Sequence, residues 1–212
     1  FVWANVNCER NLCVLLNQIK EERKIYSTLV SEKEDALRHE VIERLSILGY
    51  EFKYGAIDNT DLDLAIIDRT SKKCLAIELK WFIEPAEIRE VLQRSEEIKK
   101  GVKQAGEIRD QFNEGNERLI SSLLEIDASY EFLAIVGSVN FIGNLDAQDT
   151  SIPVVKVWHL ISKIQEEGNL GSVMSWLSNR NYLPEKDSDY EIQKVPIKSG
   201  EWESEWYGIK YA

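Results

Sequence analysis

Residues 74–82 read CLAIELKWF, in which two charged residues, Glu78 and Lys80, interrupt an otherwise apolar run. A near-continuous apolar run is typical of a strand covered on both faces, in the centre of a sheet. Burying a charge is costly unless the charge is paired, hydrogen-bonded or bound to a metal ion. The run therefore predicts a partner for Glu78 and Lys80. An edge strand with a solvated polar face is the alternative that stays open.

The segments around this run predict an α/β domain with a mixed sheet flanked by helices. Ser31 and Glu34 fit a capping box, which predicts a helix that starts there and ends at Gly49. Gly101 and Gly106 are points where a later, long helix could bend or split. The predicted strands are 50–56, 61–68, 74–82, 130–139 and 151–158, the second and third forming a hairpin; the predicted helices are 31–48, 85–113, 116–126, 159–168 and 171–179.

Three parts are expected along the chain of 212 residues. Residues 1–30 form an N-terminal helical extension, 31–180 the α/β domain and 181–212 an acidic C-terminal tail packed on the core. Because the chain opens without methionine, we expect a further domain before Phe1. No apolar run approaches the roughly 18–20 residues of a membrane helix, and no signal peptide is recognisable, so we expect a cytoplasmic protein that does not bind membranes.

Composition excludes several other kinds of site. Cys8, Cys13 and Cys74 are odd in number and not spaced like a zinc site, so reduced thiols are expected. His39 and His159 lie far apart, no serine or cysteine has a nucleophile-elbow setting, and no P-loop is present. The net charge of −11 argues against a protein that simply coats DNA, because such affinity comes from Lys and Arg.

Strand periodicity gathers charged residues on one side of the predicted sheet. Glu78 and Lys80 alternate on one strand, as Asp61 and Asp63 do on the preceding one. Carboxylates placed together repel one another unless a cation lies between them, and oxygen ligands favour Mg²⁺ or Mn²⁺. A lysine two residues beyond a metal-binding glutamate can orient water and offset charge in a transition state. Hydrolysis of phosphodiesters needs such a set of groups.

These residues resemble the PD-(D/E)xK nuclease superfamily, which has the restriction-endonuclease-like fold. The motif residues are Asp63 in DLDLAII, then Glu78 and Lys80 in AIELK, within the order α-β-β-β-α-β over residues 31–160. Leu62 stands where the motif names proline, and Asp61 competes with Asp63 for the first position. The resemblance implies a Mg²⁺- or Mn²⁺-dependent nuclease that acts on DNA rather than RNA and leaves a 5′-phosphate. It implies that Asp63, Glu78 and the Leu79 carbonyl bind the metal and that Lys80 positions the attacking water.

Further site residues are expected on the helices. The resemblance implies a glutamate from the first helix, and the arc covered by Ala36, Leu37, Val41, Leu45, Ile47 and Leu48 includes Glu40. An ion pair between Glu40 and Arg44 is the alternative. Gln104 matches a glutamine common near the active site of several subfamilies. Lys99, Lys100 and Lys103 form a basic patch that either contacts phosphates or is a solvated helix face.

A second function fits the same sequence. The acidic charge favours a catalytically silent nuclease-fold module that serves protein interaction or scaffolding in a larger protein. A third reading has the missing N-terminal part or another subunit supply the affinity for DNA. Trp202, Trp206 and Tyr207 are expected either to stack on bases or to anchor the tail. The oligomeric state, including a homo-oligomer, stays open.

Overall fold

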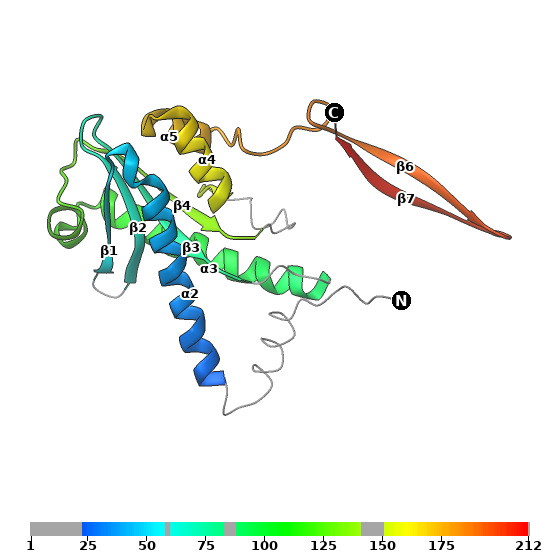
Figure 1. Ribbon diagram of the computed structural model, residues 1–212, viewed down its shortest axis with the longest axis horizontal. Helices are drawn as coiled ribbons and strands as arrows, with labels where there is room; N and C mark the ends of the chain where they lie inside the picture. Colours follow the sequence, from blue (N-terminus) through cyan, green and yellow to red (C-terminus); the bar gives the residue numbers. More distant parts are fainter. Residues whose placement is uncertain (1–22, 58–59, 83–87, 141–150, 212) are drawn as a thin grey trace. The chain divides into compact units, whose positions relative to one another are not determined.

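The computed structural model describes residues 23–57, 60–82, 88–140 and 151–211 (Figure 1). In chain order its elements are α2 (Arg23–Leu45), η1 (Ser46–Leu48), β1 (Glu51–Ile57), β2 (Thr60–Asp68), β3 (Lys73–Lys80), α3 (Ile88–Asn113), η2 (Arg118–Leu123), β4 (Glu131–Ser138), β5 (Val154–Lys156), α4 (Val157–Glu167), α5 (Leu170–Ser178), β6 (Tyr190–Ser199) and β7 (Trp202–Tyr211). The described residues divide into two compact units, with the boundary after Met174.

The first unit contains a mixed five-stranded sheet in the order β1-β2-β3-β4-β5. β1, β2 and β3 pair antiparallel, whereas β3, β4 and β5 pair parallel. The predicted α/β class, the mixed sheet and the order α-β-β-β-α-β are thereby confirmed. β3 is the third strand of five, so the alternative of an exposed edge strand for residues 74–82 is wrong.

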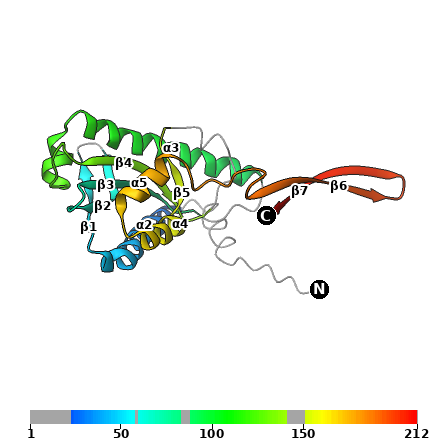
Figure 2. The same ribbon diagram turned by 90° about the horizontal axis from the view of Figure 1, so that it is seen from above.

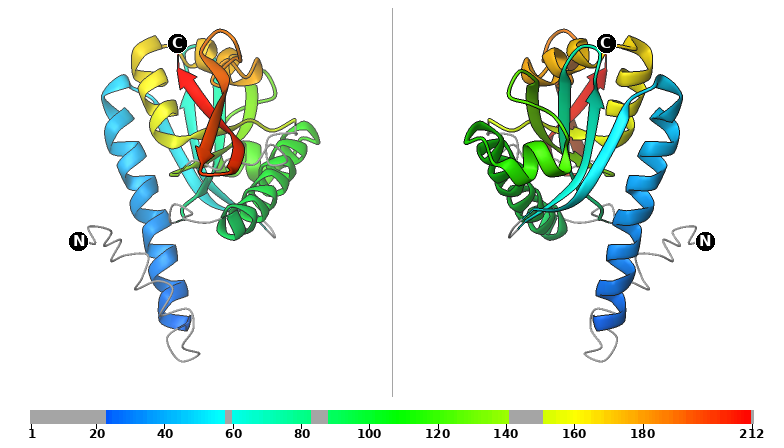
Figure 3. Two further views of the ribbon diagram at one scale, coloured as in Figure 1. Left: turned by 90° about the vertical axis from the view of Figure 1, so that its right-hand side faces the viewer. Right: turned by 90° about the vertical axis from the view of Figure 1, so that its left-hand side faces the viewer.

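Helices cover both faces of this sheet. Figures 2 and 3 show α3 on one face and α2 with α4 on the other. The α3 face carries a buried cluster in which Ile98, Ala105 and Ile108 pack with Cys74 and Ala76 of β3. Because both faces are covered, residues 74–79 of β3 are all buried, which agrees with their apolar sequence.

The first described helix is longer than its sequence signals predict. α2 is helical from Arg23, so the predicted start at Ser31 is wrong. A capping-box pattern of residue types is equally compatible with a helix interior when the preceding residues continue the helix. α2 itself ends at Leu45, and the helical run continues through η1 to the predicted end at Gly49, which adopts a left-handed conformation with φ of 76°. Likewise α3 runs unbroken through Gly101 and Gly106.

The second unit contains an antiparallel hairpin of β6 and β7 within the segment predicted as an acidic tail. The strands pair from Tyr190 with Tyr211 to Ser199 with Trp202, and Gly200 makes the turn with φ of 61°. These two strands are not predicted from the sequence. The packing of the tail on the core, and the three-part division of the chain, stay predictions. Among the described residues, no helix combines the length and apolar character needed to cross a membrane.

Candidate active site

β2 and β3 separate at the position of the charged residues. The β2–β3 ladder ends with Leu64 opposite Ile77, whereas β3 stays paired with β4 as far as Lys80 opposite Ser138. From Glu78 onward β3 is therefore paired on one side. Asp63 fills part of the opening, because its Oδ2 accepts a hydrogen bond of 2.8 Å from the Leu79 N–H. This side chain thus replaces a backbone acceptor that β2 no longer supplies.

A bulge in β2 sets the orientation of Asp63. Lys53 of β1 is opposite Ala65, and Gly55 is opposite Leu62, so Asp63 and Leu64 together face the single residue between them on β1. An extra residue of this kind bends a strand and changes the direction of its side chains. The bulge explains how Asp63 reaches the backbone of β3.

The Leu79 carbonyl faces the same opening. In an extended strand the N–H and C=O groups of one residue point toward the same neighbouring strand. Because the Leu79 N–H donates to Asp63, the Leu79 carbonyl is directed to the Asp63 side of β3. This is the carbonyl that the sequence predicts as a metal ligand.

Glu78, Lys80 and Gln104 meet between β3 and α3. Glu78 is 5% exposed, and Lys80 Nζ lies 2.6 Å from its Oε1 and 3.1 Å from Gln104 Oε1. α3 approaches closely here because Gly101 has no side chain, and a Cβ at that position would lie 2.9 Å from Lys80 Cε. The two charges therefore satisfy each other, and Gln104 gives the ammonium a second partner.

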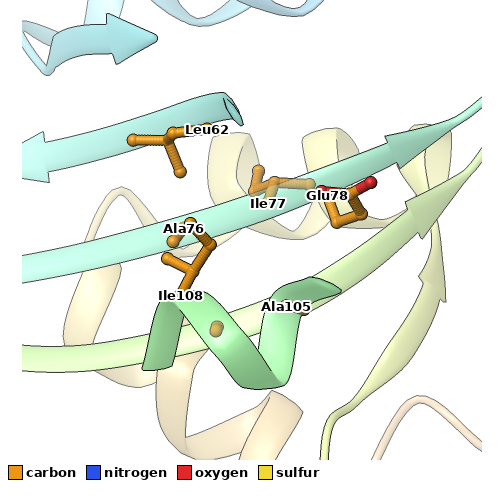
Figure 4. A pocket seen from close by; sticks show the side chains of 7 residues that line it. Leu62, Ala76, Ile77, Glu78, Ala105 and Ile108 are labelled. Carbon is orange, nitrogen blue, oxygen red and sulfur yellow. The ribbon is translucent and has the colours of Figure 1, made fainter. Parts of the chain in front are cut away.

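Apolar packing surrounds the Glu78 carboxylate. Next to Glu78 the sheet and α3 enclose a cavity of about 10 Å³ lined by Leu62, Ala76, Ala105 and Ile108 (Figure 4). Burial here, followed by the charge of Asp63, raises the pKa of Glu78 to about 7 despite the ammonium of Lys80. Since apolar surroundings disfavour the charged form, this carboxylate gains from a nearby cation.

Two further carboxylates share this environment. Burial raises the pKa of Asp63, against the opposing effects of the Leu79 N–H and of Lys80. Burial also raises the pKa of Glu34 on α2, which interacts electrostatically with Lys80 and Asp63. Glu34 is thus a carboxylate of α2 whose charge interacts with the site. From the sequence it is assigned only to a capping box.

Glu40, the predicted helix carboxylate, is placed elsewhere. Its Oε1 lies 2.7 Å from Arg44 Nη2 on the outer surface of α2, which is the ion pair considered as the alternative. The prediction included Ala36 and Ile47 in the apolar arc, but both are exposed, and Ile47 lies in η1 beyond the end of the helix. The predicted role of Glu40 toward the sheet therefore does not fit this geometry.

The remaining predicted residues lie at the surface. Asp61 is exposed, so Asp63 is the carboxylate of β2 that contacts β3. Lys99, Lys100 and Lys103 project from an exposed face of α3, where each forms an ion pair with a glutamate three or four residues away, namely Glu96, Glu97 and Glu107. Their contact with nucleic acid stays a prediction.

The donor atoms suit a hard divalent cation. Carboxylate and carbonyl oxygens are the ligands that Mg²⁺ and Mn²⁺ take, and Mg²⁺ usually retains several water ligands. Burial is the main cause that raises the pKa of Glu34, Asp63 and Glu78, so a cation beside them would favour their charged forms. No group of three or more His, Cys, Asp or Glu side chains is arranged to hold a metal within residues 23–57, 60–82, 88–140 and 151–211. A cation here would be held by few side chains, with a backbone oxygen and water completing its shell.

Comparisons of this chain with protein-family models, with curated proteins and with solved structures gave no match.

Proposed function

We propose that this chain is a metal-dependent nuclease of the PD-(D/E)xK superfamily that hydrolyses phosphodiester bonds of DNA. The observation that carries the proposal is the pair of buried Glu78 and half-buried Lys80 beside Asp63, at the point where β2 and β3 separate. A sheet built for stability alone gains little from three charges gathered where two of its strands separate. The order of helix and strands around them supports the same assignment.

Asp63, Glu78 and the Leu79 carbonyl would hold Mg²⁺ or Mn²⁺, and Glu34 would add a contact through water. When bound, the cation polarises the phosphodiester and lowers the pKa of a water ligand. The protein keeps these oxygens in place through the β2 bulge and through the hydrogen bond from Leu79 to Asp63. Fixed donors of this kind limit the reorganisation needed during the reaction.

Lys80 contacts both Glu78 and Gln104, so its ammonium can keep one partner when the other is engaged elsewhere. Its ammonium neutralises Glu78 at 2.6 Å, and Gln104 Oε1 lies 3.1 Å from it. With a cation beside Glu78, the amide of Gln104 would still hold Lys80 Nζ near the site. There Lys80 orients the attacking water and offsets negative charge on the phosphate. Gln104 is a positioning residue in this scheme.

The test is cleavage of plasmid DNA and of single-stranded DNA with Mg²⁺ or Mn²⁺ by the wild type, Glu78→Gln and Lys80→Gln. Both substitutions remove a charge and keep most of the side-chain volume. We expect cleavage by the wild type and a loss of about 100-fold or more in each variant, as for a removed catalytic group. Glu43→Gln, at an exposed position of α2, is the control. Cleavage at the wild-type rate by both site variants would end the proposal.

A catalytically silent module for protein interaction is the second candidate. It is favoured by the lack of a third ligating side chain among the described residues and by the net charge of −11. Calorimetric titration with Mn²⁺ separates the two candidates. A nuclease binds Mn²⁺ with an affinity that Glu78→Gln reduces, whereas a silent module gives no binding in either protein.

A further inference from the structure

A pocket of about 300 Å³ opens between α2, β1 and β2. Its lining includes Glu34, Asp35 and Arg38 of α2, Tyr54 of β1, and Asp61 with Asp63 of β2. The volume lies at the lower end of the range of pockets for small molecules. We call it the Arg38 pocket. Because Asp63 lines it, it is continuous with the proposed active site.

Arg38 is the cationic side chain among the residues that line this pocket. Its guanidinium stacks on the Tyr54 ring, 4.4 Å from the centroid, and Nη1 lies 3.4 Å from the Asp63 carbonyl oxygen. The side chain is 17% exposed. Stacking and partial burial restrict the guanidinium to one orientation before any ligand arrives, which lowers the entropy cost of binding.

The carboxylate that pairs with Arg38 is easily replaced. Asp35 forms an ion pair with Arg38 Nη2 but is 59% exposed. Exposed ion pairs contribute little to stability. A phosphate, in contrast, accepts two parallel hydrogen bonds from a guanidinium. Exchange of Asp35 for a phosphate would therefore cost little and would give Arg38 the better partner.

We propose that the Arg38 pocket binds a phosphodiester next to the one that is cleaved, with Arg38 as its ligand and Tyr54 as the support of the guanidinium. The inference rests on the proposed function. Four carboxylates and one guanidinium line the pocket, so its own charge repels phosphate. A divalent cation at Asp63 and Glu78 reverses much of that repulsion. Binding of nucleic acid therefore requires the cation first.

The test measures binding rather than cleavage. A short fluorescein-labelled single-stranded oligonucleotide is titrated with the full chain by fluorescence anisotropy, in Ca²⁺ and in EDTA, and a gel verifies that the probe stays intact. We expect binding in Ca²⁺ and a large loss in EDTA. Arg38→Gln should weaken binding in Ca²⁺ by about tenfold or more, as for a lost hydrogen bond to a charged group. The slope of log affinity against log salt should fall by about 0.7, as for one lost phosphate contact.

Arg44→Gln is the matched control. Arg44 lies on the same helix, pairs with Glu40 and stacks at 4.9 Å on Trp158, but it lies outside the lining of the Arg38 pocket. We expect its loss to change affinity by less than about twofold, as for an exposed charge. Equal losses in Arg38→Gln and Arg44→Gln would show a general charge effect and overturn the inference.

Asp35→Asn provides a second test that leaves Arg38 in place. This exposed change removes the internal competitor, so binding should tighten more than in Glu43→Gln, which removes one charge elsewhere on α2. Equal tightening in both variants would refute the exchange of partners.

The outcomes also separate this inference from the proposed function. Binding that depends on Arg38 without cleavage would refute the nuclease and keep the pocket. Cleavage together with an oligonucleotide affinity that is unchanged in Arg38→Gln would refute the pocket. An absence of binding in Ca²⁺ would also refute it.

Discussion

Replacing Gly101 by alanine should separate the activity of this protein from its stability. In α3 a Cβ at residue 101 would lie 2.9 Å from Lys80 Cε and 3.4 Å from Val136 Cγ1. Carbon atoms pack at about 3.5–4.0 Å, so Lys80 Cε must move by about 0.6–1.1 Å. The end of a lysine side chain moves easily, so the overlap is relieved at the expense of its position.

The magnitudes follow from this geometry. Alanine gains about 1 kcal/mol over glycine inside a helix, and the contact with Val136 offsets part of that gain. We therefore expect a free energy of unfolding within about 1 kcal/mol of the wild type in urea titrations. Lys80 Nζ, however, shifts relative to Glu78 and Gln104 while the ion pair persists, and a misplacement of about 1 Å costs roughly 100-fold in rate.

Gly106→Ala is the control on the same helix. A Cβ at residue 106 has no neighbour within 4 Å, so this variant should be more stable by about 1 kcal/mol and should cleave DNA as the wild type does. The assays are urea unfolding and Mn²⁺-dependent cleavage rates of all three proteins. Full activity in Gly101→Ala, or an equal loss in Gly106→Ala, would refute the reasoning.

Three further results are expected. Glu34→Gln should weaken Mn²⁺ binding in calorimetry by several-fold. Glu40→Gln should leave it unchanged because Glu40 pairs with Arg44. The reverse result would favour Glu40 as the helix carboxylate of the site, as the sequence predicts. Burial raises the pKa of Glu78 from 4.5 to about 7, so the folded, metal-free protein retains a proton that the unfolded chain releases. The free energy of unfolding of the wild type, taken relative to that of Glu78→Gln, should therefore fall as pH rises from about 4.5 to about 7, and a difference that does not change with pH in urea titrations would contradict this. Burial raises the pKa of the Cys74 thiol to about 12, so maleimide at pH 8 should label the Cys74 peptide only in urea, as mass spectrometry can verify.

The central strands could be predicted because helices cover the sheet on both faces, and this burial requires a continuous apolar sequence. Burial of residues 74–79 on both faces requires apolar residues at successive positions, and two charges within such a run are conspicuous. The short connection from β2 to β3 also fixes their antiparallel pairing. Asp63, Glu78 and Lys80 could therefore be placed near one another from sequence alone.

The choice of the helix carboxylate depended on which residues form the buried face of the helix. On α2 the buried residues Leu37, Val41 and Leu45 follow each other at intervals of four. Glu34 lies on their arc at about 100° per residue, and Glu40 lies well to one side. The position of Glu34 three residues before Leu37 is the signal that could have identified it.

The pocket around Arg38 and the β6–β7 hairpin depend on features that sequence patterns record only weakly. The bulge at Asp63 shifts the register of β1 against β2 by one residue, and Gly55 of β1, with φ of 143°, is a weak sign of it in the sequence. In β6 and β7 both faces carry apolar and charged residues, so the two-residue periodicity of a one-sided strand is absent. Gly200 was the local sign of a turn there.

The hydrogen bond between Asp63 and Leu79 separates two properties of Asp63, namely its oxygen acceptor and its negative charge. The junction of β2 and β3 needs an oxygen that accepts the Leu79 N–H, and the side-chain amide of asparagine would supply one equally well. A chain that had kept the sheet and lost the chemistry could therefore carry asparagine here without loss of stability. The negative charge is the part of Asp63 that the architecture does not need and that burial penalises. A cationic ligand would give this charge the partner that the sheet itself does not provide.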